Sequence, residues 1–111
     1  MSLAVDELSE RIRLILGEMP HVREQKMFGG RAFMLAGNMV VAPMKDGSLL
    51  VRVGKEGMDE ALSQPGASRM EMNGRSMGGF VVVSGDAVED DEVLAEWVAR
   101  GRRVAEALPP K

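Results

Sequence analysis

The stretch from Met39 to Val53, MVVAPMKDGSLLVRV, decides the fold class of this chain. Its second half alternates with a period of two, with Leu49, Val51 and Val53 on one side and Leu50 and Arg52 on the other. Such alternation is typical of a strand whose two faces meet different surroundings. The Asp46-Gly47 dipeptide tolerates the positive φ angles of a tight turn. The stretch therefore predicts two antiparallel strands, 39–43 and 48–53.

Turn signals of the same kind occur on both sides of this hairpin. The dipeptides Gly37-Asn38 and Asn73-Gly74 are each flanked by apolar residues, which predicts two more hairpins. Further strands are expected over the segments 23–28, 31–36, 67–72 and 79–84. Since hairpins join antiparallel neighbours, the sheet is predicted to be antiparallel, with about five to six strands.

Amphipathic helices are expected at both ends of the chain. The first is predicted over 3–19, with an apolar stripe of Val5, Leu8, Ile12, Ile15, Leu16 and Met19. The last is predicted over 90–108, with a stripe of Leu94, Trp97, Val98, Gly101, Val104, Ala105 and Leu108. A short helix is expected over 55–62. Two amphipathic helices need a sheet face to cover, which predicts a two-layer α+β sandwich with both long helices on one face.

Two positions of the last helix carry specific predictions. Trp97 lies centrally on the apolar stripe, so it is expected to be buried against the sheet. Gly101 costs about 1 kcal/mol relative to alanine inside a helix. Close packing on the sheet is the expected reason for this glycine.

Length and composition narrow the class of protein. The chain has 111 residues, which predicts a single domain, 1–111. It has no cysteine, and 14 basic and 17 acidic residues give a net charge of −3. That balance argues against a dedicated nucleic-acid-binding domain. Without a long apolar run, a signal peptide or cysteines, the chain is expected in the cytoplasm and not in a membrane.

The residue types needed for catalysis or metal binding are scarce. His21 is the only histidine, and there is no tyrosine. The acidic run from Glu89 to Glu92 suits the positive end of a helix dipole better than a calcium loop. No cofactor, metal site or enzymatic activity is therefore predicted.

A candidate interaction site lies in the segment Lys26-Met27-Phe28-Gly29-Gly30-Arg31. A Gly-Gly pair within a strand region marks a bulge or a close approach of backbone or ligand. Met27 and Phe28 offer apolar area beside it, and Arg52 and Arg75 add cations on nearby strands. These cations either pair with carboxylates within the fold or form a surface for an acidic partner. The ten methionines likewise allow core filling, the commoner use, or an adaptable binding surface.

Several motifs in order resemble the N-terminal domain of the TfoX/Sxy competence-regulator family. They are KMFGG at 26–30, Phe33, Gly37-Asn38, DGSLLVRV at 46–53, GRSMGGF at 74–80, LAEWV at 94–98 and the closing ALPPK. The resemblance implies an α+β fold around an antiparallel sheet, a regulatory role and no catalytic residues. Better-known members assist a cyclic-AMP-responsive transcription factor at competence genes. In two-domain members a helical domain follows, so this chain, which ends at Lys111, resembles a stand-alone member.

The sequence is thus interpreted as a non-enzymatic regulatory module that binds a protein, such as a transcription factor. Its predicted partner-binding residues are Lys26, Met27, Phe28, Gly29, Gly30, Arg31, Arg52 and Arg75. The alternative is a weak nucleic-acid-binding protein that uses the strand-borne Lys and Arg on phosphates. A small-ligand or enzymatic role in a pocket beside Gly29-Gly30 is the third reading. A homodimer is compatible with all three.

Overall fold

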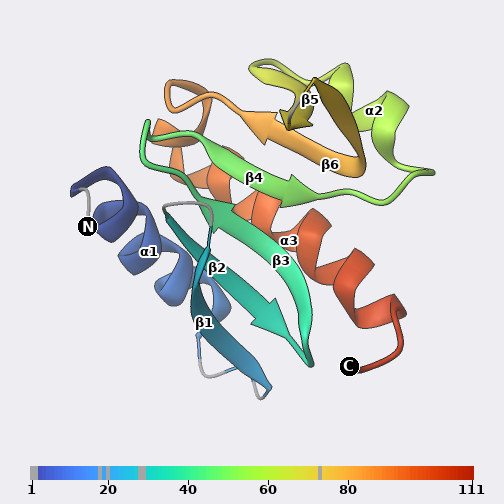
Figure 1. The fold of residues 1–111 in the computed structure, drawn as a ribbon. Helices are drawn as coiled ribbons and strands as arrows, with labels where there is room; N and C mark the ends of the chain where they lie inside the picture. Colours follow the sequence, from blue (N-terminus) through green and yellow to red (C-terminus); the bar gives the residue numbers. More distant parts are fainter. Residues whose placement is uncertain (1–2, 18, 20, 28–29, 73) are drawn as a thin grey trace.

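A computed structural model describes residues 3–17, 19, 21–27, 30–72 and 74–111, with the side chains of residues 3, 72 and 75–77 outside the description (Figure 1). The helices are α1 (Leu3–Leu16), α2 (Met58–Leu62) and α3 (Asp91–Ala107), with a 3-10 turn over Ala87–Glu89. The strands are β1 (Val22–Met27), β2 (Gly30–Leu35), β3 (Asn38–Pro43), β4 (Leu49–Arg52), β5 (Ala67–Met72) and β6 (Arg75–Val83).

All six strands form one antiparallel sheet in the order β1-β2-β3-β4-β6-β5. Successive hairpins build the first four strands. The chain then passes through α2 to the far edge, where β5 turns back into β6, and β6 pairs with β4. The predicted α+β fold with an antiparallel sheet is confirmed.

The main core lies between the sheet and the helices. In Figure 1, α3 crosses behind the central strands, and α1 contacts both α3 and the β2–β3 part of the sheet. Trp97 is only 3% exposed and joins this core with Leu94 and Val98, as predicted. A Cβ on Gly101 would lie 2.5 Å from the carbonyl oxygen of Val40, so the predicted close packing of this glycine on the sheet is confirmed.

Several element ends differ from the sequence prediction, most of them by one to three residues, and α2 begins at Met58 instead of 55. Helix α1 ends at Leu16, because Gly17 adopts a φ of +61°. Ile15, predicted to be on the buried stripe, is 38% exposed, so this assignment was wrong. Strand β6 begins at Arg75, four residues before the predicted start at 79, because the segment 75–78 continues the β5–β6 hairpin.

The β2–β3 turn is shifted by one residue from the predicted Gly37-Asn38. Ala36 and Gly37 form the two-residue loop, with φ angles of 51° and 87°, and Leu35 pairs with Asn38. Asn38 instead lies at the start of β3, only 2% exposed. Its Nδ2 donates a hydrogen bond to the Pro109 carbonyl at 2.9 Å, which attaches the segment after α3 to this turn.

The Asp46-Gly47 turn forms where the sequence predicts it. A carboxylate oxygen of Asp46 accepts hydrogen bonds from the backbone amide and the hydroxyl of Ser48, at 2.9 and 2.5 Å. These bonds lower the pKa of Asp46 below its ordinary value. Gly47 has a φ of +89°, which glycine adopts without strain.

Candidate protein-binding face

The predicted corner at 26–31 spans the β1–β2 hairpin. Lys26 and Arg31 are paired across it, and Met27 is paired with Gly30. Gly30 is buried, and a Cβ there would collide with the Pro43 carbonyl. A neighbouring backbone, and not a ligand, therefore explains why Gly30 has no side chain. Phe28 and Gly29 lie outside the described residues.

Arg31 belongs to an ion-pair network on the helix side of the sheet. Its Nη1 lies 3.1 Å from Oε1 of Glu24, and Arg13 of α1 holds the same carboxylate with two hydrogen bonds of 2.6 Å. The bonds from Arg13, and then those from Arg31, lower the pKa of Glu24. Arg31 thus contributes to fixing α1 against β1 and β2.

Arg52 lies on the opposite sheet face. Side chains alternate along a strand, so Arg31 shares the face of Phe33, which packs on the helices, whereas Arg52 shares the face of Leu50. The guanidinium carbon of Arg52 is 4.7 Å from the ring centroid of Phe80, its partner on β6. Arg52 Nε donates a hydrogen bond of 2.7 Å to the Met39 carbonyl.

The structure therefore does not bring the predicted site residues together on one face. The strand register places Lys26 and Arg31 on the sheet face that the helices cover, while Met27 and Arg52 belong to the other face. The backbone of Arg75 begins β6 at the β5–β6 hairpin, and its side chain lies outside the description. Whether any of these residues binds a partner stays a prediction.

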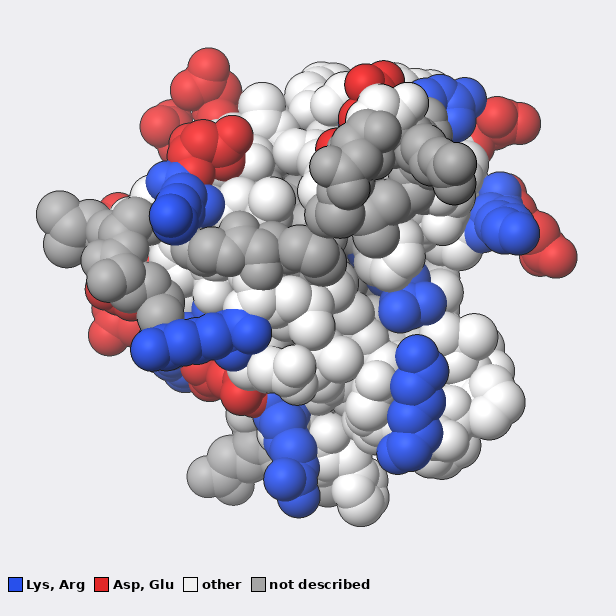
Figure 2. Space-filling model, viewed as in Figure 1, with Lys and Arg blue, Asp and Glu red and all other residues white. Residues whose placement is uncertain are grey.

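The face away from the helices carries its own apolar cluster. Its buried members are Ala32, Met39, Ala42, Leu50 and Met70, and its partly buried members are Met27, Met34, Met44, Phe80 and Val82. Figure 2 views this face: among the described side chains, uncharged ones lie across its centre with several Lys and Arg among them, and Asp and Glu lie mostly toward its outline. We call this set of ten residues, together with Arg52, the methionine face.

Methionine is concentrated on this face. Of the seven methionines whose side chains the structure describes, five belong to the methionine face: Met27, Met34, Met39, Met44 and Met70. The other two, Met19 and Met58, pack on the helix side. Sequence reasoning counted the methionines but could not place them, because their distribution depends on the register of each strand.

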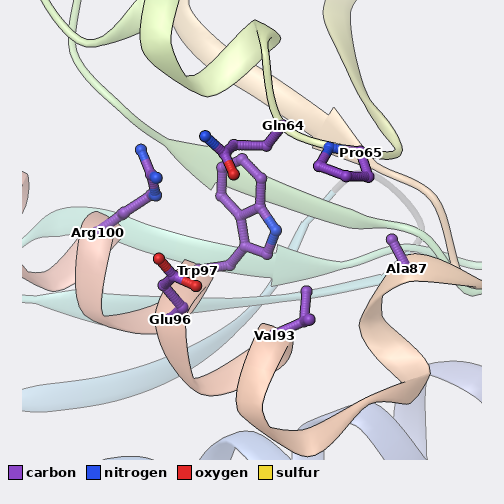
Figure 3. A pocket seen from close by; sticks show the side chains of 7 residues that line it. All are labelled: Gln64, Pro65, Ala87, Val93, Glu96, Trp97 and Arg100. Carbon is purple, nitrogen blue, oxygen red and sulfur yellow. The ribbon is translucent and has the colours of Figure 1, made fainter.

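A separate small cavity of about 270 Å³ lies beside Trp97 (Figure 3). Gln64 and Pro65 line it from the segment after α2, and α3 contributes Glu96 and Arg100. Figure 3 shows the indole between these two groups of side chains. Arg100 lies over the indole at 5.1 Å and pairs with Glu60 at 3.2 Å, so its charge is already compensated. The cavity offers little exposed aromatic surface.

Within the described residues, no group of three or more His, Cys, Asp or Glu could hold a metal ion. In the same part of the chain, no helix has both the length and the apolar character needed to cross a membrane.

Comparison with known families gives one clear match. The model of the TfoX N-terminal domain matches residues 15–105. This chain belongs to the TfoX N-terminal domain family. The match runs from the end of α1 into the last turns of α3, so it includes the whole sheet of this TfoX domain and both its faces. The family resemblance predicted from the sequence is confirmed, and it supports a regulatory, competence-related class of protein. Comparison with curated proteins finds no match.

Proposed function

We propose that this TfoX N-terminal domain is a non-enzymatic protein-interaction module whose partner binds the methionine face. One observation carries the proposal. All three described α-helices contribute to the core on one side of the sheet, whereas the other side presents partly buried apolar side chains of its own. A regulatory domain acts by binding, and this face carries partly buried apolar side chains that a partner could contact.

The chemistry of the methionine face suits a protein partner. Methionine side chains are flexible and polarizable, so they adapt to the shape of a bound surface. The centres of protein interfaces are enriched in aromatic residues, methionine and arginine. Phe80, Arg52 and five methionines bring these three residue types together here.

A transcription factor is the kind of partner that the family suggests, and a protein suits this face better than a nucleic acid does. Phosphate binding needs several clustered cations, because each neutralised phosphate adds to the affinity. Around Arg52 the described neighbours are apolar, and the chain as a whole has a charge of −3. We therefore propose a protein partner for this face.

The test compares two aspartate substitutions on opposite sides of the molecule. Met34→Asp places a charge on the methionine face, where Met34 is partly buried. Leu14→Asp is the matched control on α1, where Leu14 is 84% exposed. Each variant, as tagged full chain, is used to capture proteins from the native lysate, with quantification by mass spectrometry.

We expect Leu14→Asp to capture the same proteins as the wild type and Met34→Asp to lose them. Circular dichroism and thermal melting check that both variants fold. If folded Met34→Asp captures every protein that the wild type does, the proposed face is wrong.

A further inference from the structure

Arg52 occupies an unusual position for an arginine. It lies on β4, an interior strand between β3 and β6. Its Nε hydrogen bond to Met39 fixes it toward β3, and the ring of Phe80 supports it from β6. The guanidinium is therefore held in place by groups on both neighbouring strands.

Arg52 also lacks the counterion that comparable arginines have. Four other described arginines are partly buried, and each pairs with a carboxylate: Arg11, Arg31, Arg100 and Arg102. Arg52 is partly buried as well, but among the described residues no carboxylate pairs with it. The remaining arginines without such a pair, Arg23, Arg69 and Arg103, are exposed to water in the described structure.

This arrangement leaves a charge incompletely compensated. Removing a guanidinium from water is costly unless charged or polar groups replace the water. Burial indeed lowers the pKa of Arg52, which means that its charged form is disfavoured relative to an exposed arginine. Nε of Arg52 donates its hydrogen bond to the Met39 carbonyl, whereas the two terminal nitrogens have no described partner. Those nitrogens are the donors that bind carboxylates in two-point contacts.

We propose that Arg52 is a carboxylate-binding site on the methionine face. The ligand is a peptide segment of the partner that carries an Asp or Glu flanked by apolar side chains. This inference rests on the proposed function and adds the chemistry of the partner. The carboxylate of this segment pairs with the Arg52 guanidinium, and its apolar side chains contact Met27, Met34 and their neighbours.

Charge complementarity and surroundings both select this ligand. A carboxylate near Arg52 would lie among apolar groups, where opposite charges attract more strongly than in water. A nucleic-acid strand carries a phosphate at every step, and the apolar neighbours of Arg52 have nothing to offer the following phosphates. An apolar peptide with a single acid matches Arg52, whose ring contact is Phe80 and whose face carries the apolar side chains of the methionine face.

The experiment uses two peptide arrays that differ in one atom group. The first holds random apolar peptides, each with one central Asp, and the second holds the same peptides with Asn in its place. Spots of single-stranded oligothymidine are included on both. The wild type is compared with Arg52→Gln, with Arg52→Lys, and with Met34→Asp.

The wild type is expected to bind Asp peptides at least about tenfold more tightly than their Asn counterparts, the typical effect of a charged hydrogen bond. Arg52→Gln should bind both arrays equally, because the amide keeps a donor but no charge. Arg52→Lys should show a reduced preference, because an ammonium lacks the two-point geometry. If Arg52→Gln does not fold, Phe80→Leu is used instead, and it should weaken the Asp preference by freeing the guanidinium.

Other outcomes separate the inference from the proposed function. Equal binding of both arrays by the wild type, with loss in Met34→Asp, overturns the role of Arg52 but keeps the face. Absence of binding to either array overturns the peptide ligand, whereas the proposed face itself stands or falls with the capture experiment on Met34→Asp. Preferential binding to oligothymidine, or self-association that Met34→Asp abolishes, assigns the face to nucleic acid or to a second copy, and either result overturns the peptide ligand.

Discussion

Gly101 of α3 lies directly against the carbonyl of Val40 on β3. A Cβ at this glycine would be 2.5 Å from the carbonyl oxygen and 3.1 Å from the carbonyl carbon. Backbone atoms thus touch between the helix and the sheet. This contact sets how closely α3 can approach the sheet, and Trp97, one turn earlier, is buried by the same approach.

Gly101→Ala should lower the free energy of unfolding. Alanine gains about 1 kcal/mol in helix propensity, but its methyl group would overlap a backbone oxygen, and overpacking costs about 1–3 kcal/mol. We expect the overlap to dominate, with a net loss of up to about 2 kcal/mol. Urea unfolding measures it. Arg103→Ala, on the exposed side of α3, is the control and should change little; a stabilised Gly101→Ala would show that the helix can move away from β3.

Trp97→Ala should cost about 3–5 kcal/mol, because a large side chain is removed from the main core. That is a large part of the stability of a small domain. Thermal melting gives the result, and Leu14→Ala, at an 84% exposed position, should stay within about 0.5 kcal/mol of the wild type. Since Trp97 is the only tryptophan, its fluorescence should also shift to longer wavelength on unfolding. A folded, equally stable Trp97→Ala would contradict the core described for α3.

Much of the fold was predictable from local patterns. The alternation at 49–53, the Asp46-Gly47 turn and the stripe around Trp97 each identify an element and its buried side. The order of the strands was not predictable, because no local sequence pattern indicates that β6 inserts between β4 and β5. The start of β6 was also missed, because a segment with Gly78 and Gly79 is weak in strand propensity and is held by pairing with β5.

Ala36→Gly should stabilise the protein slightly or leave it unchanged. Ala36 has a φ of 51°, a region in which an ordinary residue pays about 1–2 kcal/mol and glycine does not. The greater freedom of glycine in the unfolded chain offsets about 0.4–1 kcal/mol of this gain. Urea unfolding compares it with Ala61→Gly in the buried part of α2, which should destabilise by about 1 kcal/mol or more. A loss at Ala36 as large as that at Ala61 would contradict the assigned turn.

Glu24 should make the free energy of unfolding depend on pH in the acidic range. Because Arg13 lowers the pKa of Glu24, the unfolded state binds more protons than the folded state between the two pKa values. The stabilisation from ionised Glu24 is complete above the ordinary pKa of a glutamate. It disappears as the pH falls through the lower pKa that Glu24 has in the folded protein. Urea unfolding at about pH 7 and about pH 3 should therefore show a smaller loss for Glu24→Gln than for the wild type. Arg13→Gln should flatten the dependence as well, and identical losses in all three proteins would refute the link.

The candidate site was predictable only in part. The sequence indicated cations on strands and a Gly-Gly corner, and it gave the partner-binding residues as one group. The parity of positions within each strand separates them: Arg31 falls on the side of Phe33, and Arg52 on the side of Leu50. That Arg52 lacks a carboxylate, while Arg31 has Glu24, depends on contacts between segments distant in the sequence. The methionine face likewise appears only after six strands are in register.

The central claim is that the methionine face binds the partner, and the methionine methyl groups report on it directly. The measurement is a methyl NMR spectrum of the methionine-labelled protein, titrated with the Asp peptide that binds best on the array. We expect the methyl signals of Met27, Met34, Met39, Met44 and Met70 to shift, and those of Met19 and Met58, which pack on the helix side, to stay unchanged. Shifts confined to Met19 and Met58, with the methionine face unchanged under saturating peptide, would contradict the account.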